Sequence, residues 1–339
     1  MTSPSLRPLA GEPQQLYDLL RRWLAEPDGP LMVRTSGSSG EPKDVVLSAA
    51  ALRASARAAD ARLGGAGRWL LALPATYVAG LNVLVRSALA GHPPVLTDGS
   101  LARAAVTMRG ERTYTALVPT QLHRLAAADE LSALSGFDAV LVGGAALRPE
   151  LAQQAAAAGV EVVQTYGASE TCGGCVYDGV PLDGVEVRLD DGRVQLAGPV
   201  LFDGYAGRPE LTAQVLVDGW FSTGDLGRLD EGRLQVLGRA DDVAVSGGVN
   251  IALGAVTSAL LSVPGVRDAV AVGVPDQEWG SRVVAVVAGS TDLLAVRETV
   301  AAALPRAWAP QRLVLVDALP LLDTGKVDRV GVQVLAAGS

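Results

Sequence analysis

Short apolar runs alternate with helical patterns in the first half of the chain, and this alternation constrains the fold more than any other feature. Residues 113–120, 137–144 and 160–167 have the length and composition of buried strands, while residues 121–128 and 147–159 have helical spacing. Strands that alternate with helices form a mostly parallel sheet with helices packed on it. The sequence therefore predicts an α/β fold whose ligands bind at the glycine-rich turns that follow the strands.

The pattern changes near residue 180, where short strands are joined by Asp-Gly and Glu-Gly pairs in 185–198 and 227–238. Such pairs close β-hairpins, so a β-rich subdomain is expected over about 180–238. A domain boundary is expected near residue 240, giving an N-terminal domain of residues 1–240 and a C-terminal domain of residues 241–339. Periodicity also predicts helices at 16–25, 81–89, 251–263 and 292–304, and strands at 268–274 and 281–289. A short apolar run lies at 68–74.

Composition excludes several classes of protein. The chain has 339 residues, a formal net charge of -8 and 49% hydrophobic residues, with no basic stripe that could neutralise a nucleic-acid backbone. No segment has the 18 or so consecutive apolar residues of a membrane span, and the N-terminus lacks a signal-peptide pattern. We expect a cytoplasmic protein that binds compact ligands rather than nucleic acid.

The two cysteines, Cys172 and Cys175, are spaced as C-G-G-C. A redox pair, a structural zinc site and a glycine-rich turn with two reduced thiols all remain open. A zinc site needs four ligands, however, and the chain has only these cysteines and the histidines His92 and His123. The turn with reduced thiols is favoured for a cytosolic protein.

Residues 34 to 43 read RTSGSSGEPK, which combines glycines, hydroxyl side chains and a lysine. Glycine permits consecutive backbone N–H groups to point at one anion, while hydroxyls donate to its oxygens and lysine offsets its charge. The segment is not a Walker A loop, because Pro42 and Asp44 stand where that motif needs glycine and a hydroxyl. From these ten residues alone, a phosphate-binding loop and a flexible linker both remain open.

Four further segments follow the loop in a fixed order. They are YGASET (166–171), WFSTGD (220–225), GRADD with SGGVN (238–242 and 246–250), and PLLDTGKVDR (320–329). Together they decide against the linker. With them the chain resembles the adenylate-forming superfamily of acyl-CoA synthetases, adenylation domains and luciferases over nearly all of residues 31 to 330. Within it, the wording of several segments is most similar to the o-succinylbenzoate-CoA ligases of menaquinone biosynthesis, especially the short actinobacterial type.

The resemblance implies a luciferase-like fold with a large N-terminal α/β domain, shortened at its N-terminus, and a small mobile α+β C-terminal domain. It also implies a reaction in two steps. A carboxylate attacks the α-phosphate of ATP to give an acyl-adenylate and pyrophosphate, and the coenzyme A thiolate then attacks the activated carbonyl. Lys326 would stabilise the first transition state, and the loop of Thr35, Ser36, Gly37, Ser38, Ser39, Gly40 and Lys43 would hold the departing phosphates.

Further roles follow from the same resemblance. Glu170 would associate with Mg²⁺, with Ser169 or Thr171 beside it as a phosphate or water ligand, and Asp225 would accept from the ribose hydroxyls. Arg239 would contact ribose or phosphate, and Asp241 would be the hinge about which the C-terminal domain rotates. Gly144, Ala145, Ala146, Tyr166 and Gly167 would form the adenine slot, and Tyr77, Val78, Gly80, Leu81 and Gly143 would form the acyl pocket. Val78 stands where amino-acid-activating relatives carry an aspartate, which disfavours an amino-acid substrate.

Three residues outside these motifs, two arginines and a histidine that could serve as a base, carry side chains suited to a ligand site. Arg86 and Arg124 could pair with the second carboxylate of a dicarboxylic substrate, although surface solvation is the favoured interpretation of each, and His123 is favoured as a helix-face residue. Three functions stay open: an acyl-CoA ligase for o-succinylbenzoate, a stand-alone adenylation enzyme that loads a carrier protein, and a non-catalytic nucleotide-binding relative. Only 34 residues precede Thr35, fewer than in most relatives, which leaves dimerisation and part of the acyl pocket open.

Overall fold

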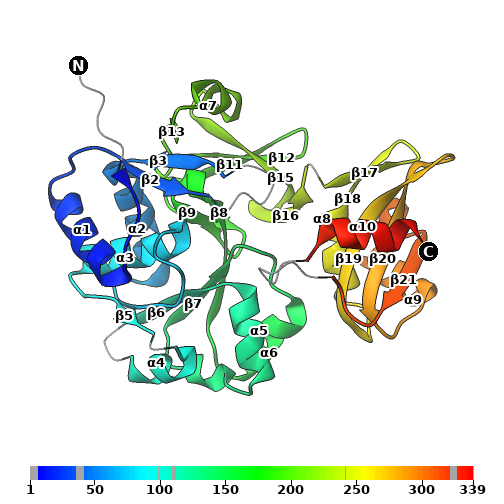
Figure 1. Ribbon diagram of the computed structural model, residues 1–339, viewed down its shortest axis with the longest axis horizontal. Coiled ribbons are helices and arrows are strands. Elements are labelled where there is room, and N and C mark those ends of the chain that lie inside the picture. The colour runs from blue at the N-terminus through cyan, green and yellow to red at the C-terminus, as the bar shows by residue number, and fades with distance from the viewer. Residues whose placement is uncertain are drawn as a thin grey trace. The chain divides into compact units, whose positions relative to one another are not determined.

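The computed structural model describes residues 7–35, 42–97, 99–108, 112–240, 242–320 and 327–338 (Figure 1). The chain forms two compact units. Unit 1 comprises Met1–Arg188, Gln195–Thr223 and Leu229–Leu234, and unit 2 comprises Leu189–Val194, Gly224–Arg228 and Gln235–Ser339. Within the described residues, no helix has the length and apolar character needed to cross a membrane.

The largest sheet of unit 1 confirms the predicted α/β fold. Its seven strands lie in the order β10-β9-β8-β7-β6-β4-β5. The pairs from β8 through β5 are parallel, whereas β9 and β10 are antiparallel to their neighbours. The central strands are buried on both faces, which explains their nearly continuous apolar runs. The strands are β4 (Arg68–Leu71), β5 (Val95–Leu96), β6 (Thr113–Leu117), β7 (Ala139–Gly143), β8 (Val162–Ala168), β9 (Gly173–Tyr177) and β10 (Val180–Pro181).

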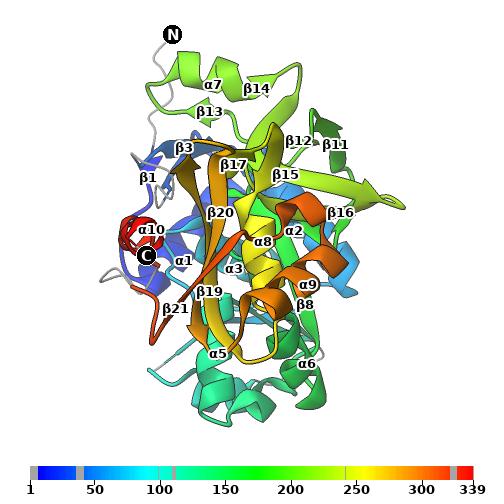
Figure 2. The ribbon, with the colours of Figure 1, turned by 90° about the vertical axis from the view of Figure 1, so that its right-hand side faces the viewer.

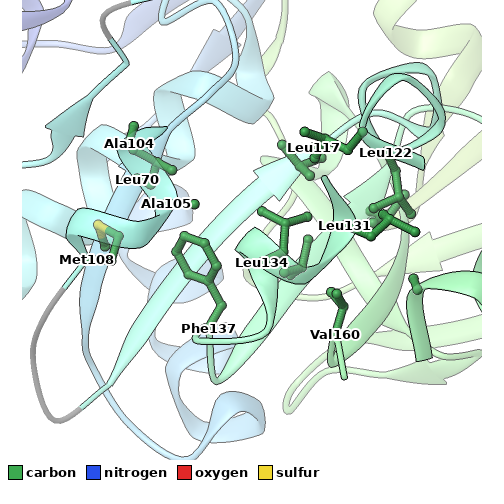
Figure 3. Packing of buried hydrophobic residues seen from close by; sticks show 14 of the residues in the cluster. Leu70, Ala104, Ala105, Met108, Leu117, Leu122, Leu131, Leu134, Phe137 and Val160 are labelled. Carbon is green, nitrogen blue, oxygen red and sulfur yellow. The ribbon is translucent and has the colours of Figure 1, made fainter. Parts of the chain in front are cut away.

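Helices cover both faces of this sheet. On one face, Leu70, Val140 and Val142 pack with Phe137 and Leu134 in a cluster that also includes apolar residues of α4, α5 and α6 (Figure 3). On the other face α2 and α3 cover the sheet, and α1 packs on α3. The helices are α1 (Pro13–Ala25), α2 (Ala49–Leu63), α3 (Val78–Ala90), α4 (Leu101–Thr107), α5 (Pro119–Ala127) and α6 (Pro149–Ala157), with the 3₁₀ helix η1 (Leu131–Leu134).

A smaller four-stranded sheet in unit 1 has the order β1-β2-β3-β13. Its strands β2 and β3 are antiparallel, and they directly flank the glycine- and serine-rich loop, so that this loop connects the two arms of a hairpin. Periodicity did not identify these strands, because four residues are too few to establish a period of two. The strands are β1 (Arg7–Pro8), β2 (Leu31–Arg34), β3 (Asp44–Leu47) and β13 (Gly204–Tyr205).

The β-rich segment forms a third sheet, in the order β11-β12-β15-β14 with β16 beside β15. Its tight hairpin turns include Asp191-Gly192 and Glu231-Gly232, as the Asp-Gly and Glu-Gly pairs predicted, and a third at Asp218-Gly219 joins β14 to β15. All six residues have positive φ, between 46° and 79°, as in the turns whose twist matches that of the flanking strands. The elements are β11 (Glu186–Asp190), β12 (Arg193–Ala197), α7 (Pro209–Val215), β14 (Leu216–Val217), β15 (Trp220–Asp230) and β16 (Arg233–Arg239).

Unit 2 is built mainly on a fourth sheet, in the order β18-β17-β20-β19 with β21 beside β20 (Figure 2). Apolar residues of α8 and α9 form a core with this sheet, and a second cluster includes Val332 and Ala336 of α10. The elements are β17 (Val243–Ser246), β18 (Val249–Ala252), α8 (Leu253–Leu260), β19 (Val266–Asp276), β20 (Gly280–Gly289), α9 (Leu293–Ala303), η3 (Arg306–Trp308), β21 (Arg312–Val316) and α10 (Arg329–Ala337).

The helix expected over 251–263 begins later than predicted. Ile251 and Ala252 belong to β18, where they pair with Ala244 and Val243 across a tight hairpin. The connection Gly247-Gly248 has positive φ at both positions, which is the geometry that a two-residue hairpin turn requires. Strand pairing across this turn therefore outweighed the helical periodicity of the apolar residues at this end of the segment.

Candidate active site

The base of the glycine- and serine-rich loop is closed by hydrogen bonds between Thr35 and Lys43. The Thr35 N–H donates to the Lys43 carbonyl at 2.8 Å, and the Lys43 N–H donates to Thr35 Oγ1 at 3.0 Å. One step further from the loop, Arg34 and Asp44 face each other across the strands with Nε to Oδ1 at 2.9 Å, and this pair lowers the pKa of Asp44. The predicted phosphate ligands Ser36, Gly37, Ser38, Ser39 and Gly40 lie outside the described residues.

Glu170 lies in a tight turn between β8 and β9. The turn is the 3₁₀ segment η2 (Ser169–Thr171), followed by Cys172 in the left-handed region at φ 51°. Thr171 Oγ1 accepts from the Ala168 N–H at 2.9 Å and donates to the Gly173 carbonyl at 2.7 Å. The fold therefore fixes the backbone that carries the predicted magnesium-associated carboxylate.

Two more contacts hold the same turn from outside. The Cys172 carbonyl accepts from Asn82 Nδ2 at 2.6 Å and from Ser55 Oγ at 3.3 Å. Before the turn, Gly167 is required because a Cβ there would lie 2.0 Å from the Gly173 carbonyl oxygen. Contacts from α2, α3 and β9 thus combine to determine the position of Glu170.

The Glu170 side chain is nearly buried, with 9% of its surface exposed, and it has a partner that sequence reasoning missed. The Tyr205 hydroxyl donates to Glu170 Oε1 at 2.7 Å, and burial together with the Glu170 charge raises the pKa of Tyr205. The Lys43 ammonium lies 5.2 Å from the centre of the Tyr205 ring. Tyr205 therefore connects the loop base to Glu170. Its position depends on the pairing of β13 with β3, for which the sequence gives no local signal.

The residues predicted for the adenine slot lie at the carboxyl ends of two neighbouring strands. Gly143 is opposite Thr165 in the β7–β8 ladder, and Gly144, Ala145 and Ala146 follow it as exposed residues. In β8, Tyr166 is half-buried and its hydroxyl donates to Thr223 Oγ1 at 3.4 Å, while Gly167 is exposed. The carboxyl ends of parallel strands are where sheets of this type bind ligands, so the placement is consistent with the predicted slot.

The predicted acyl-pocket residues lie at the start of α3. Tyr77 is the N-cap and 46% exposed, Val78 is half-buried, and Leu81 is fully buried. Gly80 is also buried, and a larger residue would not fit there, because a Cβ would lie 2.2 Å from the Pro74 carbonyl oxygen. The same helix supplies Asn82 to the Glu170 turn, so α3 connects the acyl segment to the turn. Full burial of Leu81 gives it a clear structural role in the core.

The favoured interpretation of Arg86 as a solvated surface residue is wrong. Arg86 is only 3% exposed, because α3 is buried over residues 80–87. Its Nη2 donates to the Tyr177 hydroxyl at 3.2 Å, and its guanidinium lies 4.9 Å from the centre of the Trp69 ring. In contrast, His123 and Arg124 are exposed on α5, as expected for residues on a helix surface.

The two cysteines are free and fully buried. Burial raises the pKa of both thiols above their usual range, to about 12 for Cys175. A redox thiol needs a depressed pKa and access to solvent, and these have neither. Among the described residues no group of three or more histidine, cysteine, aspartate or glutamate side chains is arranged to hold a metal ion. The interpretation as reduced thiols fits this environment best.

Asp225, predicted to bind the ribose, and Arg239, predicted to contact ribose or phosphate, form an ion pair within unit 2. Arg239 Nη1 lies 3.6 Å from Asp225 Oδ1. Further along, Arg329 at the start of α10 pairs with Asp242, with Nη1 to Oδ1 at 2.6 Å and Nη2 to Oδ2 at 2.7 Å. The predicted hinge Asp241 and the predicted catalytic Lys326 lie outside the described residues.

Comparison with known protein families agrees with this arrangement. Residues 20–205 match the family described as AMP-binding enzyme, and residues 255–326 match its C-terminal domain. The chain belongs to the AMP-binding enzymes. The resemblance stated from the motifs and the adenylate-forming fold are therefore confirmed.

Individual AMP-binding enzymes are similar to this one over most of its length. A Mycobacterium tuberculosis protein named "Probable 2-succinylbenzoate--CoA ligase" is 45% identical over 328 residues, covering 92% of this chain and 85% of that protein. The o-succinylbenzoate CoA synthetase of Bacillus subtilis, solved with its acyl-adenylate intermediate, has a TM-score of 0.76 and 28% identity, covering 89% of this chain and 68% of that one. The amide bond synthetase of Marinactinospora thermotolerans has a TM-score of 0.78 and 30% identity, covering 90% and 69%.

Proposed function

We propose that this AMP-binding enzyme is an acid-thiol ligase that converts o-succinylbenzoate, ATP and coenzyme A into o-succinylbenzoyl-CoA, AMP and pyrophosphate, a step of menaquinone biosynthesis. The observation that carries the proposal is the 45% identity, over 92% of the chain, to the protein named as such a ligase. The arrangement of the described site supports the same chemistry, because a carboxylate, a lysine and an oriented hydroxyl meet at Glu170, Lys43 and Tyr205.

In the first step an oxygen of the substrate carboxylate forms a bond to the α-phosphorus of ATP, and the bond to pyrophosphate breaks. The loop that begins at Thr35 and ends at Lys43 would bind the departing phosphates. Mg²⁺ prefers one or two carboxylates plus phosphate oxygens, so Glu170 with ATP provides a suitable set of ligands. When bound, the metal would offset the negative charge of the phosphates.

In the second step the coenzyme A thiolate forms a bond to the acyl carbonyl carbon, and AMP leaves with the electrons of the acyl–phosphate bond. Asp225 would hold the ribose diol through its acceptor oxygens, and Arg239 would contact ribose or phosphate. Lys326 would act in the first step only, because it would leave the site when the C-terminal domain rotates about Asp241. The cytoplasmic location and homo-oligomerisation stay predictions.

A second candidate function uses the same first step with another acceptor. The similarity to an amide bond synthetase, at 30% identity, supports a fold that is compatible with acceptors other than coenzyme A. A carrier-protein thiol therefore remains the main alternative. A non-catalytic relative is disfavoured by the presence together of Lys43, Glu170, Asp225, Arg239 and Lys326 in the sequence.

The experiment that separates these functions uses the purified protein with ATP, Mg²⁺, coenzyme A and a panel of carboxylic acids that includes o-succinylbenzoate. Mass spectrometry should detect o-succinylbenzoyl-CoA and AMP, with other acids giving little product. Acyl-adenylate without a thioester would support the carrier-protein function instead. No adenylate from any acid in the panel would contradict the proposal.

A further inference from the structure

Tyr205 makes two contacts with groups to which the proposed function gives roles, although it belongs to none of the sequence motifs. Its hydroxyl donates to Glu170 Oε1 at 2.7 Å. Its ring face lies 5.2 Å from the Lys43 ammonium, a distance at which a cation is attracted to the ring. The phenol therefore stands between the magnesium-associated carboxylate and the lysine at the end of the phosphate loop.

The surroundings of Tyr205 fix its ring in place. Its N–H donates to Thr212 Oγ1 at 2.9 Å, and β13 pairs it with Val45 of β3. The ring packs against Phe202 with centroids 5.0 Å apart, and Phe202 packs in turn on Phe221 at 5.5 Å. The Phe202 N–H also donates to the Glu170 carbonyl at 2.8 Å, so backbone and side chain of Glu170 are held by the same short segment.

We propose that Tyr205 is a positioning residue for the binding of ATP with Mg²⁺. Its hydroxyl occupies one carboxylate oxygen of Glu170, so that the other oxygen is left for Mg²⁺. Its ring positions the Lys43 ammonium. The proposal rests on the proposed function, which assigns Mg²⁺ to Glu170. The 2.7 Å hydrogen bond, in which the phenol donates to Oε1 and leaves Oε2 for another partner, is the contact that this role requires.

A hydrogen bond to a carboxylate is stronger than one between neutral groups, and partners of metal-ligating groups fix their orientation. Removing such a partner typically lowers metal affinity or activity by about 10- to 100-fold. The hydroxyl and the ring have separable effects, because phenylalanine keeps the ring beside Lys43 and removes only the donor. Leucine removes both.

The test is a Mg²⁺ titration of ATP binding by calorimetry on the full-length protein, together with ATP–pyrophosphate exchange. Tyr205→Phe should raise the Mg²⁺ concentration for half-maximal ATP binding about tenfold, while the exchange rate at saturating Mg²⁺ falls less. Tyr205→Leu should show a larger shift, because Lys43 also loses its contact with the ring. In a double-mutant cycle with Glu170→Gln, the two changes should be clearly non-additive.

The matched control is Tyr114→Phe, which removes a phenol hydroxyl in β6 that donates to the Leu63 and Gly65 carbonyls at 3.0 Å. It should lower thermal stability without changing the Mg²⁺ requirement. An unchanged Mg²⁺ requirement in Tyr205→Phe, or the same change in both variants, would overturn the proposal. Should Tyr205→Phe fail to fold, Thr212→Val loosens the same residue without removing its phenol, and an unchanged Mg²⁺ requirement there would have the same meaning.

The two proposals fail in different ways. Binding of ATP with Mg²⁺ is measured without an acyl substrate, so a wrong substrate assignment leaves the calorimetric test intact. If the wild-type protein binds ATP independently of Mg²⁺, the Tyr205 proposal is wrong even where o-succinylbenzoyl-CoA is formed.

Discussion

The residues proposed to bind the nucleotide are held differently in the two units, as a comparison of the Glu170 turn of unit 1 with the Asp225–Arg239 pair of unit 2 shows. Glu170 is 9% exposed and accepts a 2.7 Å hydrogen bond from Tyr205. The side chains of Arg239 and Asp225 are 43% and 20% exposed and approach only to 3.6 Å. Buried hydrogen bonds to a charged group are costly to break, whereas half-buried ion pairs at a longer distance contribute less. The contacts of Glu170, the proposed Mg²⁺ ligand, are therefore formed before any substrate binds, whereas Asp225 and Arg239, the proposed ribose and phosphate contacts, hold each other less tightly.

The first prediction concerns the residue of unit 2 whose substitution should change the reaction rate most. Lys326→Ala should lower ATP–pyrophosphate exchange about a hundred- to thousandfold, equivalent to ~2.7–4 kcal/mol of transition-state stabilisation, because one preorganised positive charge is lost. Conversion of supplied acyl-adenylate to thioester should be kept. Both half-reactions are measured separately by radiolabelled exchange and by thioester formation.

Lys43→Ala is the matched lysine control for this prediction, since Lys43 belongs to unit 1 and should not distinguish the half-reactions in the same way. We expect a smaller loss of exchange from Lys43→Ala than from Lys326→Ala. Equal loss of both half-reactions in Lys326→Ala would show that this lysine has no step-specific role, and would remove the reason for a domain rotation about Asp241.

The second prediction tests whether the Glu170 turn is as tightly built as the contacts indicate. Gly167→Ala places a Cβ 2.0 Å from the Gly173 carbonyl oxygen, so the strands β8 and β9 must separate locally. We expect a loss of about 1–3 kcal/mol in the free energy of unfolding, as for other overpacked sites, and a higher Mg²⁺ requirement. Chemical denaturation and the Mg²⁺ titration measure these two effects.

Gly136→Ala is the control, because a Cβ at that glycine meets no atom within 4 Å and its φ is not positive. Its free energy of unfolding should stay the same or rise slightly, through the lower entropy of the unfolded chain. If Gly167→Ala were as stable as Gly136→Ala, the turn would be able to relax, and the contrast with unit 2 would be lost.

The sequence predicted the central strands of the large sheet and the helices between them because long apolar runs and a helical period are local properties, whereas α2 and the short strands β2 and β3 were not predicted. The hairpins at Asp191-Gly192 and Glu231-Gly232 were predicted for the same reason, because each turn depends on only two residues. Family resemblance identified Glu170 and Asp225, whose assigned roles stay proposals. Local signals therefore sufficed for the longer elements and for the motifs, but not for the four-residue strands β2 and β3.

Tyr205 and Arg86 show what local signals do not contain. The place of Tyr205 depends on the pairing of the two-residue strand β13 with β3. Arg86 is buried because Trp69 and Tyr177, which are distant in sequence, provide a ring face and a hydroxyl for its guanidinium. Each is a tertiary environment that overrides the usual preference of a polar side chain for solvent.

The third prediction has the smallest expected effect and tests Asp225, the proposed ribose ligand. Asp225→Asn keeps an acceptor oxygen but loses its charge, so the KM for ATP should rise by about tenfold, which corresponds to about 1.4 kcal/mol, with little change in kcat. The free energy of unfolding should change by less than about 1 kcal/mol, because a half-buried ion pair whose charged atoms are 3.6 Å apart contributes little. Asp230→Asn, at an exposed position of the same strand β15, should leave both quantities unchanged. A loss of several kcal/mol in Asp225→Asn would mean that the Asp225–Arg239 pair is structural. The contrast between the Glu170 turn and this pair would then be lost.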